Sequence, residues 1–473
     1  MTTRTRLTIL VAYLMLSTAV VVAVEPPAPG SGVKLPPYKT LTLKNGMIVL
    51  LMEQHKVPLV NFGYIVRSGS VADPTGKEGL ASVTAALLRK GTRTRTAGQI
   101  SEALDLVGAS YTASANTEFS SGVAEFMKKD ISGGLDLFAD LLINPVFPEG
   151  EVKKLIAQRI DGLKAAKDNA EAVIATYYNA FLFGSHPYGR PFVGDESSLA
   201  TIGRDDIVQF HASRYVPSNM ILSVVGDFNA AEMEKALKEK LGAWTSKEKV
   251  AEAKLAAAEP VFGNRLLLVD KPDATQTNFM IGNVGVARNN PDRVAIDVVN
   301  TLFGGRFTSM INTALRVESG LTYGALAYFD VRYKLPGPFF ISSYTRTAST
   351  EEAIDMALDV LGRLHEKGIG EEDLASAKAY LKGTLPPQML ETSGQLATLL
   401  AELRFYELPD DEINDFYSRV DAVTLADAKR VIATYYPKKD LAFVLIGKAS
   451  EIEAVAKKYA PEMKRKAITE PGF

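Results

Sequence analysis

An internal duplication constrains the fold of this 473-residue chain more than any other feature of its sequence. In each half, a Tyr-x-Pro segment precedes an apolar run and then a glycine, in Tyr215–Gly226 and again in Tyr435–Gly447. Near the beginning of each half, Val60–Phe62 is echoed by Thr277–Phe279. The offset stays close to 220 residues, which indicates one duplicated domain rather than an array of short repeats. A chain of this length also exceeds what one hydrophobic core usually organises.

Local patterns predict an α+β class. Leu41–Met52 alternates apolar and polar residues around Asn45-Gly46, which is typical of a hairpin turn. Further strands are predicted at Val60–Val66, Ser110–Thr117 and Ser120–Phe126, and helices at Gly79–Lys90 and Gly133–Leu142. We therefore expect two homologous domains, each a mainly antiparallel sheet with helices packed on one face, and a binding cleft between them.

The predicted organisation begins with an export signal. Arg4 and Arg6 precede an apolar run, and Ala23 offers the small residue that a signal peptidase requires. The predicted parts are a signal peptide (1–23), a linker (24–38), a first domain (39–250), a second linker (251–259) and a second domain (260–473). We expect a periplasmic protein, with an uncleaved membrane anchor as the alternative.

Composition excludes several classes of function. The formal net charge is −2, so there is no basic excess of the kind that nucleic acid requires. There are no cysteines, which excludes disulfides, cysteine nucleophiles and thiolate metal sites.

Residues 79–92, with the sequence GLASVTAALLRKGT, resemble the zinc-site helix of the pitrilysin/insulinase family of peptidases. In that family a His-x-x-Glu-His motif is followed by a Lys-Gly-Thr-like ending. Two histidines at i and i+4 lie on one helical face and can hold one zinc ion, while the glutamate activates a water. The matching residues here are Ser82, Ala85 and Ala86, which supply neither imidazole nor carboxylate.

The family's third ligand is a glutamate on a later helix, before an Asp-Asn pair. Here that position falls at Asp161 or Gly162, before Asp168-Asn169. The four histidines, His55, His186, His211 and His365, have no helical zinc spacing between them. His186 lies in a loop similar to the family's His-Pro-x-Gly-x-Pro loop, where we expect a hydrogen bond that stabilises the turn. The sequence thus predicts no metal and no catalytic residue on this chain.

A second motif is intact. Phe303–Tyr323 is similar to the family's C-terminal signature, a Gly-Gly turn, a helix bearing Leu-Arg and then Gly-Leu-x-Tyr. We expect Thr308 to cap this helix, Gly320 to end it, and Tyr323 to enter a strand.

The resemblance implies that Arg316 and Tyr323 bind substrate across the cleft. A guanidinium can hold a peptide carbonyl and a phenol can donate to a developing oxyanion. The alternative is an exposed helix arginine and a tyrosine packed for its ring.

The resemblance covers about residues 38–460 and implies a clamshell assembly. The expected function is that of the non-catalytic subunit of an exported heterodimeric zinc metallopeptidase. A homologous partner would carry the zinc, and both chains would enclose the peptide. The alternatives are a zinc-free scaffold and a peptide-binding homodimer.

Overall fold

The computed structural model describes residues 32–246, 250 and 255–473. The predicted signal peptide, most of the linker 24–38 and the first part of the linker 251–259 lie outside these residues. Among the described residues, no helix is both long and apolar enough to cross a bilayer.

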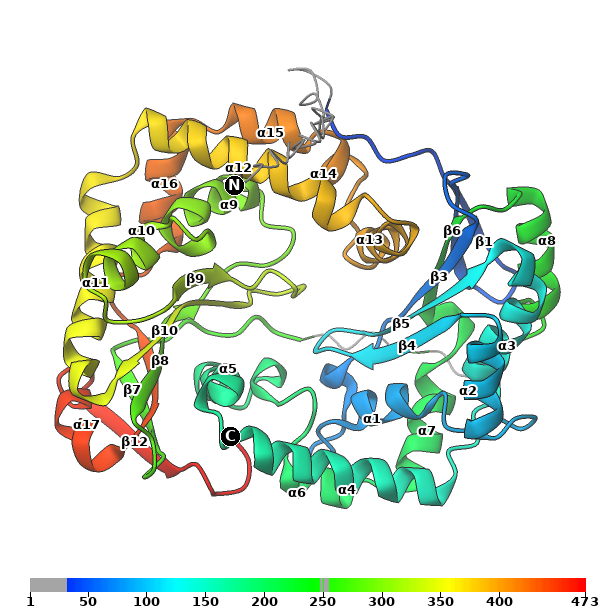
Figure 1. Ribbon diagram of the computed structural model, residues 1–473, viewed down its shortest axis with the longest axis horizontal. Helices are drawn as coiled ribbons and strands as arrows, with labels where there is room; N and C mark the ends of the chain where they lie inside the picture. Colours follow the sequence, from blue (N-terminus) through cyan, green and yellow to red (C-terminus); the bar gives the residue numbers. More distant parts are fainter. Residues whose placement is uncertain (1–31, 247–249, 251–254) are drawn as a thin grey trace, which may run out of the picture.

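Two sheets of six strands form the framework (Figure 1). The first has the order β1-β2-β6-β3-β5-β4 and the second the order β12-β7-β11-β8-β10-β9. The strands of the first sheet are β1 Lys39–Thr42, β2 Ile48–Glu53, β3 Leu59–Val66, β4 Ser110–Ala115, β5 Ser120–Met127 and β6 Met220–Gly226. Those of the second are β7 Arg265–Asp270, β8 Gln276–Val284, β9 Ala325–Phe329, β10 Pro338–Arg346, β11 Ala442–Gly447 and β12 Glu462–Ala467.

The shared strand order confirms the α+β class and agrees with the duplication. Most neighbours in both sheets are antiparallel; the parallel pairs are β2–β6 in the first sheet and β7–β11 and β7–β12 in the second. The outermost strand differs between the halves. The Asn45-Gly46 hairpin pairs β1 antiparallel to β2, whereas β12 returns from the C-terminus and pairs parallel to β7.

Helices cover the outer face of each sheet and line the space between the sheets (Figure 1). The helices of the first half are α1 Leu80–Leu87, α2 Ala97–Leu106, α3 Ile131–Ile143, α4 Glu149–Ala166, α5 Ala170–Phe183, α6 Glu196–Thr201, α7 Arg204–Arg214 and α8 Ala230–Leu241. Those of the second are α9 Arg293–Asn300, α10 Met310–Asn312, α11 Thr350–Lys367, α12 Glu371–Met389, α13 Ser393–Phe405, α14 Asp411–Asn414, α15 Phe416–Ala422, α16 Leu425–Tyr435 and α17 Ala449–Ala456. Two π-helical turns, Thr301–Gly305 and Thr313–Glu318, flank α10.

The two halves exchange helices across the centre of the molecule, which the sequence did not predict. Helix α13 of the second half packs on β3 and β6, and Ser223 donates a hydrogen bond to the Ala397 carbonyl at 2.5 Å. Helix α5 of the first half packs on β8 and β11, and Tyr178 donates to the Phe339 carbonyl at 2.8 Å. Each sheet is therefore covered on its inner face by a helix of the other half, so the predicted domains are interlocked.

A buried polar contact joins the halves at a second place. The Glu118 carboxylate accepts hydrogen bonds from the Tyr188 hydroxyl and from the Lys334 backbone, the latter at 2.9 Å. Tyr188 belongs to the His-Pro loop, in which Nδ1 of His186 accepts from the Tyr188 backbone at 3.1 Å. The prediction that His186 stabilises this turn is confirmed, and the turn also holds the two halves together.

Candidate functional site

Helix α1 carries the positions at which the resemblance places two zinc histidines and the general base. The buried Asp73 carboxylate accepts from the backbones of Gly79 and Ala81 at 2.9 Å each, which fixes where the helix begins. Burial raises the pKa of Asp73 to about 7, against the opposing effect of these hydrogen bonds. Ser82 is 6% exposed and Ala85 is 1% exposed, so this part of α1 is packed inside the protein.

A guanidinium group contacts the helix at the first of these positions. Arg159 of α4 donates to the Ser82 hydroxyl at 2.8 Å and to the Ser82 carbonyl at 3.1 Å. Burial lowers the pKa of Arg159. Sequence patterns alone do not single out Arg159, because an arginine on an amphipathic helix usually faces solvent.

The residues at this place do not fit a zinc ion. Zinc needs imidazole, thiolate or carboxylate ligands, and a serine hydroxyl with two alanines provides none. Arginine offers only donors and a positive charge, which repels a divalent cation. Gly162 lies one helical turn after Arg159 and, like Asp161, is exposed; a Cβ added at Gly162 would meet no atom within 4 Å. Among the described residues, no group of three or more His, Cys, Asp or Glu side chains is arranged to hold a metal ion.

The histidines have structural contacts. Nε2 of His211 donates to the Leu142 carbonyl at 2.9 Å, and the ring stacks on Tyr215. Nε2 of His365 donates to the Tyr436 carbonyl at 2.9 Å. His55 contacts Asp227 at 2.7 Å, chiefly through a hydrogen bond that raises the histidine pKa.

The C-terminal signature folds differently in detail from the prediction. Ser309, not Thr308, caps the helix: its hydroxyl accepts from the Asn312 backbone, because Ser309 takes the extended conformation of an N-cap. Gly320 ends the segment with φ of +65°, as expected. Tyr323 lies in the loop before β9 rather than in a strand, since Gly324 separates it from the first paired residue, Ala325.

The structure brings Arg316 and Tyr323 to one cleft of about 790 Å³. Strands β8, β9 and β10 form its floor, and α5 contributes Glu171 to the wall. Tyr323 is 80% exposed. The Arg316 guanidinium lies 4.5 Å from the centre of the Phe307 ring and makes no hydrogen bond or ion pair with any residue that the structure describes.

An unpaired guanidinium and an exposed phenol on one cleft can both donate to the oxygens of a bound peptide. The π-helical turn that carries Arg316 agrees with such a role, because these turns are frequent at functional sites.

Comparisons with known proteins agree with the fold and the motifs. Residues 48–196 match the model of the insulinase family, peptidase family M16, and residues 201–381 match the model of the M16 inactive domain. An uncharacterized zinc protease of Mycobacterium leprae is 27% identical over 342 residues, which is 72% of this chain and 77% of the relative. The uncharacterized zinc protease YmxG of Bacillus subtilis is 23% identical over 359 residues, 76% of this chain and 86% of YmxG.

Solved structures show the same architecture. An M16 inactive-domain peptidase from Pseudomonas fluorescens has a TM-score of 0.81 at 24% identity and covers 87% of this chain and 98% of that chain. A protease from Helicobacter pylori has a TM-score of 0.80 at 21% identity, with 87% and 100% covered. The chain is thus a two-sheet peptidase homologue with blank zinc positions. It belongs to the insulinase family of peptidases, M16.

Proposed function

We propose that this chain is the non-catalytic subunit of an exported heterodimeric metallopeptidase, in which a homologous partner carries the zinc. This chain contributes Arg316 and Tyr323 and half of a chamber that encloses the peptide. The observation that carries the proposal is the contrast between the two motifs. The positions of the two zinc histidines and the general base hold Ser82 and two alanines, and Arg159 donates to Ser82, whereas Arg316 and Tyr323 remain available on an open cleft.

In this arrangement the chain's own residues bind and orient the peptide. The guanidinium of Arg316 holds a backbone carbonyl, which fixes the register of the peptide in the cleft. The phenol of Tyr323 donates to the carbonyl oxygen on which negative charge develops. The floor of β8, β9 and β10 excludes water beneath the peptide. The water-activating group and the metal belong to the partner.

The test is to purify the mature chain alone and together with a homologue that retains His-x-x-Glu-His. We expect no peptidase activity and no stoichiometric zinc in the chain alone, and both in the mixture. Full activity with bound zinc in the isolated chain would refute the proposal.

The Arg316→Ala variant tests the role of the cleft directly. Loss of one preorganised donor typically costs about 100-fold in rate, so the mixed complex should lose about that much in kcat/KM. Assembly and thermal stability should not change, because Arg316 forms no ion pair or hydrogen bond within the described chain. Arg346→Ala, an exposed arginine at the end of β10, is the matched control. Unchanged activity in Arg316→Ala would instead support a scaffold without a part in hydrolysis.

A further inference from the structure

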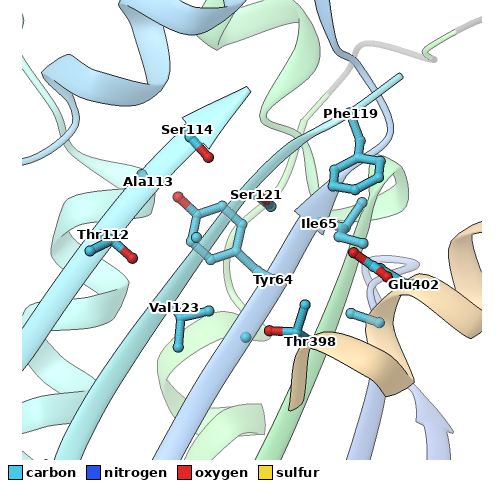
Figure 2. A pocket seen from close by; sticks show the side chains of 13 residues that line it. Tyr64, Ile65, Thr112, Ala113, Ser114, Phe119, Ser121, Val123, Thr398 and Glu402 are labelled. Carbon is cyan, nitrogen blue, oxygen red and sulfur yellow. The ribbon is translucent and has the colours of Figure 1, made fainter. Parts of the chain in front are cut away.

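A second pocket lies in the first half, where helix α13 crosses the inner face of the first sheet. It has a volume of about 180 Å³ and is lined by β3, β4, β5 and α13 (Figure 2). An apolar cavity of about 150 Å³ holds a benzene molecule, so this pocket has room for one amino-acid side chain. It does not share a lining residue with the Arg316 cleft.

Glu402 is the only charged residue among those that line this pocket. Its side chain reaches from α13 toward Phe119 and Ile65 (Figure 2). The Glu402 side chain is half-buried, and its carboxylate accepts no hydrogen bond and forms no ion pair with any residue that the structure describes. Burial raises the pKa of the Glu402 carboxyl, while Arg288 and Arg332 act in the opposite direction. A carboxylate without a partner on the protein can accept charge-assisted hydrogen bonds from a cationic ligand.

The remaining lining residues fit the shape of an alkylammonium group. The pocket is also lined by the hydroxyls of Thr112, Ser114, Ser121 and Thr398. They can accept those hydrogen bonds from the ammonium group that the Glu402 carboxylate does not accept. Phe119, Ile65 and Val123 provide apolar walls for a methylene stem. One carboxylate with neutral hydroxyls suits a singly charged ammonium better than a divalent cation, which requires several carboxylate ligands.

We propose that this pocket binds an ammonium group of the peptide, either its free N-terminus or a lysine side chain. The inference rests on the proposed role of the chain as half of a peptide chamber. It adds a preference for positively charged peptides that the Arg316 cleft, with its own cationic group, cannot supply.

The experiment measures the binding of three fluorescent decapeptides to the purified mature chain. The first is N-acetylated and contains one lysine, the second is N-acetylated with norleucine in its place, and the third has norleucine and a free N-terminus. We expect the charged peptides to bind at least tenfold more tightly than the neutral one. Whichever of the first and third peptides binds more tightly identifies the source of the ammonium group.

Two variants assign the preference to the pocket. Glu402→Gln keeps the size of the side chain and should abolish the difference between charged and neutral peptides. Glu391→Gln removes an exposed carboxylate just before α13 and should leave the difference intact. Thermal melting of each variant shows that the fold is retained.

The outcomes separate this inference from the proposed function. If all three peptides bind equally well, or if Glu402→Gln keeps the preference, the ammonium site is refuted while the chamber stands. If none of the peptides binds, the ammonium site is refuted, and the activity of the mixed complex decides the proposed function.

Discussion

Helix α1 in the first half and the π-helical turn Thr313–Glu318 in the second carry the two family motifs, and they differ in what their polar side chains contact. On α1, Ser82 is buried and held by two hydrogen bonds from Arg159. On the second helix, the guanidinium of Arg316 only stacks against Phe307. The polar side chain of the first motif is thus occupied by contacts within the protein, and we call this the closed side of the molecule. The guanidinium of the second motif has no such partner among the described residues, and we call this the open side. Stability is expected to depend on the first motif, and binding on the second.

The largest expected effect is a loss of stability of the first half at acidic pH. His211 of α7, which packs against α1, has its pKa lowered by burial to about 4 from an ordinary value of 6.5. In the unfolded chain His211 therefore binds a proton below about pH 6.5, whereas in the folded chain it binds one only below about pH 4. The contribution to stability is complete above pH 6.5, falls as the pH drops from 6.5 to 4, and totals about 3 kcal/mol.

Hydrogen exchange of α7 and α1 between pH 4 and pH 7 would measure this effect as the difference between the wild type and His211→Gln. The comparison is needed because the raised pKa of Asp73 changes stability in the opposite direction over the same range. His365→Gln is the matched variant in the second half, where the histidine pKa is also lowered. The same pH dependence in the wild type and in His211→Gln would show that His211 does not contribute to the acid sensitivity of the first half.

The contact between Arg159 and Ser82 gives the next largest effect. Arg159→Ala removes two hydrogen bonds and leaves the Ser82 hydroxyl buried without its donor, so we expect a loss of about 2 kcal/mol in the free energy of unfolding. Peptide hydrolysis by the mixed complex should not change. Urea unfolding and kcat/KM are the two measurements, and Lys164→Ala, an exposed change on the same helix, is the control. A drop in kcat/KM without a loss of stability would mean that the α1 face still contacts substrate.

These contacts also show where the sequence was sufficient. The strands β3, β4 and β5 and the hairpin at Asn45-Gly46 were predicted because their apolar patterns and turn residues are local signals. The prediction that α1 holds no zinc also rests on local identity, since Ser82 and Ala86 carry neither imidazole nor carboxylate wherever the helix lies, and it stays a prediction. Arg316 and Tyr323 were selected by motif, and the structure places both on one cleft, although their role stays a prediction.

Other features depend on contacts between residues far apart in the chain. Strand β12 has the sequence EMKRKA, which lacks an apolar alternation, and its place in the sheet comes from its pairing with β7. Helices α5 and α13 each pack on the sheet of the other half. The hydrophobic periodicity of a helix does not indicate which sheet it packs on. Arg159 and Glu402 stand out only in the fold, which places Arg159 against Ser82 and Glu402 at the edge of a pocket.

The smallest expected effect concerns the phenol on the open side. Tyr323→Phe deletes one hydroxyl from a side chain that is 80% exposed, so stability should change by less than about 0.5 kcal/mol. If the hydroxyl donates to the developing oxyanion, the mixed complex should lose about tenfold in kcat, or about 1.4 kcal/mol of transition-state stabilisation. The loss is smaller than the roughly 100-fold of a preorganised donor because the exposed phenol is not held in place by a hydrogen bond within the described chain. Tyr380 lines the same cleft and provides the matched control, Tyr380→Phe, which should keep full activity. Equal losses of kcat in both variants would assign the effect to the general polarity of the cleft. Tyr323 would then have no specific part in hydrolysis.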